Sequence, residues 1–273
     1  MLKEVVILFG AGSIGIAIAR RIGIGKHILL ADRNNENLKN QSQILNEAGY
    51  SNSIISTDIS SRESILKVAE EAKRLGKVKY LIQAAGVSPS QATIDVILRV
   101  DLYGTAVILE EFGKIIEPGG AGVVISSQSG HRLPALTQEE NDILALTDTE
   151  KLLELPLLKS IDSTLKAYQI SKRGNVLRVA AESVKWGRKG ARINSISPGI
   201  IMTPLALDEL NGPRGKMYRD MLDKTAEKRA GISDEVATLA ELMMGSDGGF
   251  INRSDFLIDG GVTAHYWYGD LKN

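Results

Sequence analysis

The chain has 273 residues, of which 43% are hydrophobic and 24% charged, so it can form one large core, and its length leaves one or two domains open. Its 33 lysines and arginines balance 33 aspartates and glutamates without a basic block, which argues against a protein that binds nucleic acid or an anionic membrane. Because there is no cysteine, disulfides, thiolate catalysis and thiolate metal sites are excluded, and three scattered histidines form no metal-ligand pattern.

Nothing in the sequence divides the chain into separate parts. No linker rich in proline, serine or glycine is present and no internal repeat, so a single domain over residues 1–273 is expected. The apolar run at residues 5–9 is too short for the core of a signal peptide or for a membrane span. The expected location is therefore the cytoplasm, with no metal and no membrane partner.

Short apolar runs alternate along the chain with segments of helical periodicity. Such an alternation predicts right-handed βαβ units and an α/β fold of the Rossmann type, a doubly wound parallel sheet of about seven strands with helices on both faces. Ligands of such sheets bind at the carboxyl ends of the strands. The predicted strands are residues 5–9, 27–31, 53–57, 78–82, 122–126, 192–196 and 256–258.

A glycine-rich turn follows the first predicted strand and precedes a predicted helix. Its glycines permit a tight turn, close approach of the backbone to a pyrophosphate and close packing of the helix on the strand, and the amino terminus of the helix then faces the phosphates. By itself the pattern is weak evidence, because many glycine turns are only structural. The candidate nucleotide-binding residues here are Gly10, Gly12, Ser13, Ile14 and Gly15.

Asp32 follows the second predicted strand, about twenty residues after the glycine turn, where a carboxylate can accept hydrogen bonds from both ribose hydroxyls and repels a 2′-phosphate. This favours NAD as the cofactor over NADP. Arg33 leaves NADP open, since a guanidinium could pair with that phosphate, although a solvated loop arginine is the simpler interpretation. After the third strand, Asp58, followed by Ile59, could accept from the adenine amino group or cap the helix that starts near Ser61.

Residues 131–160 interrupt the alternation and predict a helical insertion. Two candidate N-caps are each followed three residues later by glutamate, a capping-box pattern that predicts two short helices, and Pro156 is expected to end the insertion. A long helix over residues 163–186 is predicted after it. The two capping pairs are Thr137 with Glu140 and Thr147 with Glu150.

Tyr168 and Lys172 lie four residues apart on this long helix, so both side chains share one face. A nearby cation favours the phenolate, so a tyrosine with a reference pKa of about 10 can exchange protons nearer neutral pH. Such pairs are common on solvated helix faces, so the rest of the sequence must support a catalytic interpretation of this one.

That context resembles the short-chain dehydrogenase/reductase family over nearly the whole chain. Residues 83–86, Gln-Ala-Ala-Gly, are similar to the family's Asn-Asn-Ala-Gly turn, residues 125–130 to its Ile-Ser-Ser-x-x-Gly motif, and residues 168–172 to its Tyr-x-x-x-Lys pair. The interval from Ser127 to Tyr168 is longer than is usual in the family. This insertion is similar to those of bacterial 3α-hydroxysteroid dehydrogenase/carbonyl reductases.

The resemblance implies an oxidoreductase that uses NAD(H) to interconvert a secondary alcohol and a ketone, and a homodimer or homotetramer. In it Ser127 would hold the substrate oxygen, Tyr168 would transfer the proton, and Lys172 would favour the phenolate and bind the nicotinamide ribose. Ser126 and Ser129 are near enough in sequence to leave the choice of serine open. Further cofactor contacts are implied for Ala84, Ala85, Gly86, Pro198, Gly199, Ile201 and Thr203.

The chain departs from the family pattern at three places. Phe9 stands where the glycine turn usually has threonine, and Gln83 and Ala84 replace two asparagines. The most consequential departure is Asp101, which replaces the asparagine of the family's catalytic tetrad. We hypothesise that an ionised Asp101 partly neutralises Lys172, raises the pKa of the catalytic tyrosine and moves oxidation to alkaline pH. A protonated or water-bridged Asp101 would instead mimic the amide.

Residues 200–230 are a candidate substrate lid. Pro213 can open a helix within it that places Met217, Met221 and Leu222 on one side, which suits hydrophobic or steroid-like substrates, although such stripes often pack as core. A 3-oxoacyl-thioester ketoreductase is an alternative, against which Asp32 argues because that role expects NADPH. A non-catalytic dinucleotide sensor is another, and the intact serine, tyrosine and lysine weigh against it.

Overall fold

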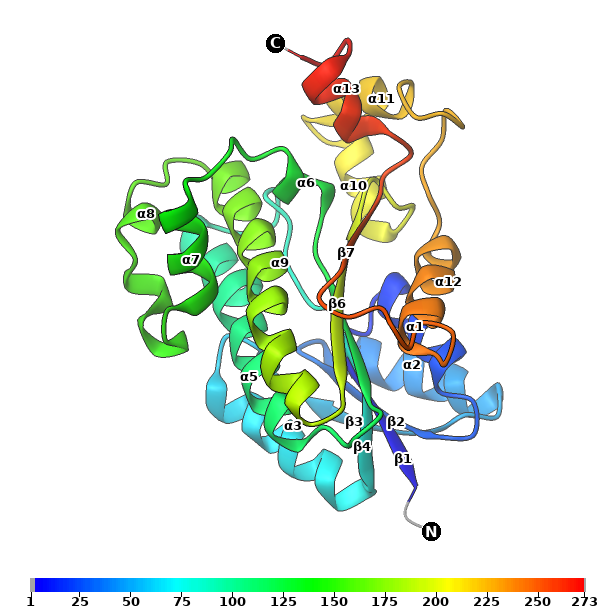
Figure 1. Cartoon of the computed structure of the whole chain (residues 1–273). Coiled ribbons are helices and arrows are strands. Elements are labelled where there is room, and N and C mark those ends of the chain that lie inside the picture. The colour runs from blue at the N-terminus through cyan, green and yellow to red at the C-terminus, as the bar shows by residue number, and fades with distance from the viewer. Residues whose placement is uncertain (1–2, 273) are drawn as a thin grey trace.

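The computed structural model describes residues 3–272 and contains a seven-stranded parallel sheet in the order β3-β2-β1-β4-β5-β6-β7 (Figure 1). This confirms the predicted doubly wound fold, and each predicted strand overlaps an observed one. The strands are β1 (Glu4–Phe9), β2 (His27–Asp32), β3 (Ser51–Ser56), β4 (Lys77–Gln83), β5 (Ala121–Ile125), β6 (Arg192–Pro198) and β7 (Asp255–Ile258).

Two layers of helices enclose the sheet (Figure 1). Alternate side chains of β1 enter the two cores, with Ile7 and Phe9 in one and Val6 and Leu8 in the other. Because both faces are covered, β1 is a nearly continuous apolar run rather than an alternating one. One layer contains α3 (Arg62–Leu75), α5 (Thr105–Ile115) and α9 (Thr164–Arg188), and the other contains α1 (Ser13–Ile22), α2 (Asn35–Glu47) and α12 (Ser233–Met244).

The winding of the sheet reverses between β1 and β4, because β2 and β3 are added on one side of β1 and the later strands on the other. Open α/β sheets bind ligands in the crevice at this reversal. The turns after β1 and β4 meet there. A Cβ on Gly10, which has a φ of +87°, would lie only 2.4 Å from the backbone nitrogen of Ala85, so the contact requires glycine.

The segment between β5 and α9 consists of α6 (Gln128–His131), α7 (Gln138–Leu146), the 3-10 helix η2 (Thr149–Glu154) and α8 (Pro156–Lys159). The capping box of Thr137 with Glu140 begins α7, as the sequence predicts. The segment has its own apolar cluster, in which side chains of α7, η2 and α8 pack against α9; it includes Leu144, Leu152, Leu158 and Ile170.

Some local predictions about helix caps and helix ends are wrong. Asp148 rather than Thr147 caps η2, since its side chain accepts from the backbone nitrogen of Glu150. Pro156 does not end the insertion; it is the first residue of α8, where the missing N–H of proline is not needed. Ser61 caps α3. The side chain of Asp58 instead accepts from the backbone and hydroxyl of Ser60.

Helices α10 (Pro204–Asn211), α11 (Gly215–Leu222) and α13 (Val262–Tyr268) lie beyond the carboxyl ends of the strands (Figure 1). Pro213 does not open α11, because the helix begins at Gly215, after its cap Arg214. Within residues 3–272, no helix combines the length and the apolar character that crossing a membrane requires.

Arg178 ties the inserted segment to α9. Its Nε donates to the carbonyl oxygen of Leu144 at 3.0 Å, and Nη2 donates to the carbonyl oxygen of Thr147. Burial lowers the pKa of Arg178, but a guanidinium remains charged at neutral pH. The side chain is 6% exposed, so water cannot easily replace these bonds.

Replacement of Arg178 by methionine is therefore expected to loosen the insertion. Methionine leaves one buried and one partly buried carbonyl without a donor, at about 1–3 kcal/mol each, so the free energy of unfolding in denaturant should fall by about 2–4 kcal/mol. Amide exchange should also accelerate in α7 and η2. Lys185→Met, on the same helix but 65% exposed, is the control and should change stability by less than about 0.5 kcal/mol. Unchanged exchange in residues 138–154 would contradict this role of Arg178.

Candidate active site

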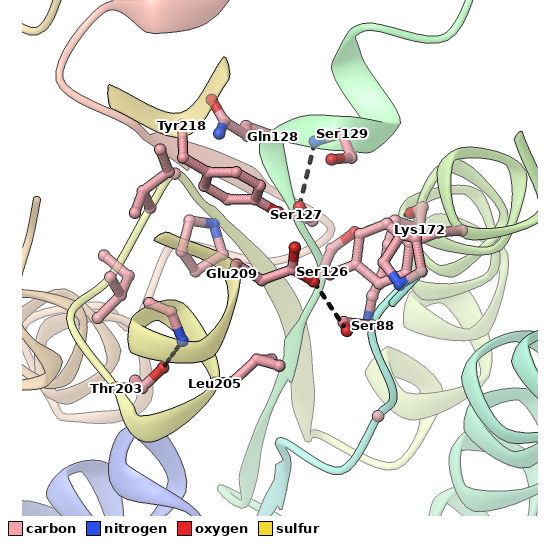
Figure 2. Close-up of a pocket in the computed structure, with 18 of the residues that line it drawn as sticks. Ser88, Ser126, Ser127, Gln128, Ser129, Lys172, Thr203, Leu205, Glu209 and Tyr218 are labelled. Atoms are coloured by element: carbon pink, nitrogen blue, oxygen red, sulfur yellow. Dashed lines mark hydrogen bonds between the residues drawn. The ribbon is translucent and has the colours of Figure 1, made fainter. Parts of the chain in front are cut away.

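A pocket lies at the carboxyl edge of the sheet, between the end of β5, helix α9 and helices α10 and α11 (Figure 2). Three of the four predicted catalytic residues line it, Ser127, Tyr168 and Lys172. Asp101 does not line the pocket; it is fully buried behind Lys172. Predicted cofactor residues that also line this pocket are Ile14, Ala84, Gly86, Pro198, Gly199, Ile201 and Thr203.

Helix α9 presents the tyrosine and the lysine to the pocket. The Nζ atom of Lys172 lies 5.3 Å from the centre of the Tyr168 ring and donates to the carbonyl oxygen of Ile125 at 3.5 Å. Burial, the largest effect, lowers the pKa of Lys172, but the charges of Asp101 and Tyr168 outweigh it and the net pKa shift is upward. Lys172 is therefore a buried ammonium beside a phenol.

The three candidate serines differ in what their hydroxyls bind. Ser126 Oγ donates to the backbone carbonyl of Lys172 at 2.8 Å, and Ser129 Oγ accepts from Arg132 at 2.9 Å. Ser127 Oγ accepts from the backbone nitrogen of Ser129 at 3.1 Å, and its own hydrogen has no acceptor among residues 3–272. The hydroxyl hydrogen of Ser126 is thus used within the protein, whereas those of Ser127 and Ser129 both remain available to a ligand in the pocket.

Asp101 lies in η1 (Leu98–Gly104), a π-helical stretch that follows α4 (Ile94–Ile97) and continues into α5. Its Oδ1 accepts from the backbone nitrogen of Val87 at 2.9 Å, while Oδ2 lies 3.9 Å from Nζ of Lys172 and has no hydrogen-bond partner in the described chain. Burial raises the pKa of Asp101 to about 6, against the opposing pull of Lys172. The buried ammonium of Lys172 therefore has a buried carboxylate, that of Asp101, as its neighbour.

A second pocket adjoins the first and shares Ala84 and Gly86 with it. Asp32 lines it, with Oδ2 accepting from the backbone nitrogen of Ala11 at 2.8 Å and Oδ1 from that of Asn34 at 2.9 Å. Arg33 lines the same pocket; it is exposed and forms no ion pair within the described residues. The other predicted residues in this pocket are Gly10, Gly12, Asp58, Ile59 and Ala85.

Two predicted cofactor residues line neither pocket. Ser13 is the exposed first residue of α1. Gly15 is buried, and a Cβ there would lie 2.4 Å from the carbonyl oxygen of Gly10, so this glycine serves the packing of α1 on β1. Gly12, by contrast, has open space around it and leaves the first turn of α1 without a side-chain cap.

The substitution of the two family asparagines is compensated locally by Gln83. Its Nε2 donates to the carbonyl oxygen of Ala85 at 3.1 Å and to Thr105 Oγ1 at 3.0 Å, so the turn after β4 stays attached to α5. Phe9 is fully buried and packs edge-on against Phe112, with ring centres 5.3 Å apart. Neither departure disrupts the crevice.

Sequence reasoning missed Glu209 and Ser88, two pocket residues from segments far apart in the chain. Glu209 of α10 is 5% exposed and accepts from Ser88 Oγ at 3.1 Å, across 121 positions of the chain. Burial, followed by the charge of Glu209, raises the pKa of Tyr218 to about 12, so its phenol stays protonated. Met217 and Met221 line the pocket as expected, whereas Leu222 does not. No local pattern around position 209 distinguishes a pocket carboxylate from a solvated one.

Comparison with known proteins gives matches over most of the chain. Residues 3–137 match the family model described as short chain dehydrogenase, and residues 158–263 match the one described as Enoyl-(Acyl carrier protein) reductase. The short-chain dehydrogenase/reductase bsc3 of Alternaria brassicicola is 40% identical, over 97% of this chain and 97% of its own. The 3-alpha-hydroxysteroid dehydrogenase/carbonyl reductase of Comamonas testosteroni is 27% identical, over 81% of this chain and 90% of its own.

Solved structures share the fold. A short-chain dehydrogenase/reductase from Serratia marcescens BCRC 10948 superimposes with a TM-score of 0.76 at 19% identity, over 96% of this chain and 98% of the other. A short chain dehydrogenase from Burkholderia cenocepacia J2315 in complex with NADP gives 0.74 at 20% identity, over 95% and 97%. These structures support the fold alone, whereas the family models and the relative at 40% identity decide the family. The chain belongs to the short-chain dehydrogenase/reductase family of oxidoreductases, which bind a nicotinamide dinucleotide.

Proposed function

We propose that this protein is an NAD(H)-dependent oxidoreductase that interconverts a secondary alcohol and a ketone. The observation that carries the proposal is that Ser127, Tyr168 and Lys172 line one pocket, which adjoins a second pocket containing the glycine turn and Asp32. A substrate and a nicotinamide can therefore meet at the shared boundary.

The second pocket fits a dinucleotide. The uncapped amides at the start of α1 can bind the pyrophosphate, and Gly12 leaves room for its approach. Both oxygens of the Asp32 carboxylate retain a free lone pair for ribose hydroxyls, and a 2′-phosphate here would face a negative charge. When bound, the nicotinamide would supply or accept the hydride. This arrangement supports NAD over NADP.

The proton is transferred by side chains at the start of α6 and on α9. In reduction, Tyr168 donates its phenolic proton to the carbonyl oxygen, while the free hydrogen of Ser127 binds the same oxygen. In oxidation, the phenolate of Tyr168 accepts the alcohol proton. Lys172, held by the carbonyl of Ile125, stabilises that phenolate in both directions.

Asp101 adjusts this proton transfer without touching the substrate. With a pKa of about 6, its carboxyl is ionised at neutral pH and offsets part of the positive charge of Lys172, 3.9 Å away. The ammonium then favours the phenolate of Tyr168 less strongly than it would beside an asparagine, so oxidation requires a higher pH. Asp101 is thus a positioning residue, not a catalytic one.

The substrate side of the pocket supports a carbon skeleton of some size. Apolar side chains from three helices surround the catalytic hydroxyls, and the Comamonas relative is named for steroid and carbonyl substrates. We therefore propose a hydrophobic ring system as the bulk of the substrate and residues 200–230 as its lid. The apolar lining residues are Leu165, Leu205, Met217 and Met221.

Tyr168→Phe tests the enzyme directly. Removal of the hydroxyl should lower kcat for cyclic secondary alcohols by about 10²- to 10⁴-fold, because the proton then has no acceptor. NADH affinity, followed by fluorescence titration, should stay within a few-fold. Tyr268→Phe, at a tyrosine that is 90% exposed, is the control and should retain full activity. Tight NADH binding with no turnover of any alcohol by the parent would favour a dinucleotide sensor instead.

The cofactor preference can be measured as the ratio of kcat/KM for NAD to that for NADP. We expect the parent to favour NAD by at least about 10-fold, since like charges near the ribose repel by more than about 1 kcal/mol. Asp32→Ser should reduce this ratio, and Arg33→Ala should change NAD kinetics little. A parent that prefers NADP, and loses that preference in Arg33→Ala, would show that the arginine rather than the aspartate decides.

Asp101→Asn should move the rise of the oxidation rate with pH to lower pH, by on the order of one unit. The sign follows because the amide leaves the charge of Lys172 uncompensated, which favours the phenolate at lower pH. The measurement is kcat for oxidation against pH at saturating NAD. Asp95→Asn is the matched control, since Asp95 is exposed and pairs only with Arg99. Superimposable profiles of parent and Asp101→Asn would exclude this effect.

A further inference from the structure

Glu209 places a carboxylate inside a pocket that otherwise suits a hydrophobic skeleton. It lies on α10 and is 5% exposed, and its Oε1 accepts from the hydroxyls of both Ser88 and Ser90. These two bonds fix the carboxylate from the loop that follows β4. Figure 2 shows the side chain pointing into the pocket among Ser88, Ser126 and Ser127.

The second oxygen of this carboxylate is not used by the protein. Oε2 has no hydrogen-bond partner in the part of the chain that the structure describes, although Oε1 has two. Oε2 is not among the fully buried side-chain atoms that lack a partner, so it is accessible from the pocket and can accept a hydrogen bond there. A hydrogen-bond donor on the ligand would complete the shell of Glu209.

The charged residues that line the pocket favour a neutral hydrogen-bond donor on the ligand over a positively charged one. Its lining contains the cations Lys172, Arg132 and Arg214, against the single carboxylate of Glu209. Arg132 forms no ion pair within residues 3–272; it is held by Ser129 and lies over the ring of Tyr266. A ligand ammonium would meet this excess of positive charge, whereas a neutral hydroxyl would not.

We propose that Glu209 is a specificity-determining residue that accepts a hydrogen bond from a second hydroxyl of the substrate. The substrate class is accordingly a cyclic diol and the corresponding hydroxy ketone, with one oxygen at Ser127 and Tyr168 and the other at Glu209. This inference rests on the proposed alcohol oxidation and narrows its substrate. In this proposal α10 does more than cover the pocket, because it carries Glu209, the residue that distinguishes between substrates.

The test compares cyclohexanol with the 1,2-, 1,3- and 1,4-cyclohexanediols as substrates with NAD. We expect the parent to prefer one diol, and Glu209→Ala to reduce the ratio of kcat/KM for that diol to kcat/KM for cyclohexanol by about 10- to 100-fold, the range for a hydrogen bond to a charged group. Glu209→Gln keeps an acceptor oxygen and should restore part of the ratio. Asp208→Ala, the exposed neighbour on α10, should leave the ratio unchanged.

A merely structural role of Glu209 predicts something different. If the carboxylate only attaches α10 to Ser88 and Ser90, Glu209→Ala and a Ser88→Ala/Ser90→Ala double variant would slow both alcohols in proportion, and an unchanged ratio would overturn the proposal. Preference for trans-2-aminocyclohexanol over every diol would also overturn it, in favour of an ammonium ligand.

A binding measurement separates a failure of the proposed alcohol oxidation from a failure of the role of Glu209, because a diol can bind without being oxidised. Calorimetric titration of the protein–NADH complex with the same diols should show an affinity at least 10-fold weaker in Glu209→Ala, as expected from the loss of the same bond. Turnover that survives Tyr168→Phe would refute the proposed reaction while leaving this binding result standing. Equal diol affinity of parent and Glu209→Ala would refute the role of Glu209.

Discussion

The close contact of helix α9 with α6 and the residues that join α6 to β5 is the constraint on which the site depends. A Cβ on Gly130 would lie 2.8 Å from the backbone nitrogen of Arg173, so only glycine allows the approach. Ser126 Oγ, bound to the carbonyl oxygen of Lys172, fixes the same contact from the other side. Because the strand and the helix come from segments far apart in the sequence, this packing alone brings the serine, tyrosine and lysine to one pocket.

Beside this contact lie two buried groups of opposite charge, Lys172 and Asp101. A buried ammonium and a buried carboxylate each lose hydration, and together they compensate one another only in part, as the raised pKa of Asp101, about 6, shows. The lining of the pocket also combines both signs of charge, Lys172, Arg132 and Arg214 with Glu209. The proposed enzyme would therefore bind an uncharged substrate between Lys172 on one side and Glu209 on the other. Its substrate selectivity would depend on which hydroxyl of the substrate lies next to the carboxylate.

The sequence predicts the layers of the fold well, and three of the catalytic candidates that it singles out line one pocket, because both predictions depend on local patterns. Apolar strands, the glycine turn and the capping box at Thr137 each follow from residues a few positions apart. The cap at Thr147 was assigned wrongly because two adjacent residues can both cap, and only the backbone conformation selects Asp148. Glu209 could not be found, since its partner Ser88 is 121 positions away. The burial of Asp101 likewise depends on tertiary packing.

The π-helical stretch of η1 limits how this part of the chain can change in length. An α-helix turns by about 100° per residue, so deleting one residue from Leu98–Gly104 would rotate everything on one side of the cut by that angle. Asp101 would then swing off the amide of Val87, to which its Oδ1 is bound. The position of Asp101 beside Lys172 therefore depends on the length of this stretch as well as on its side chains.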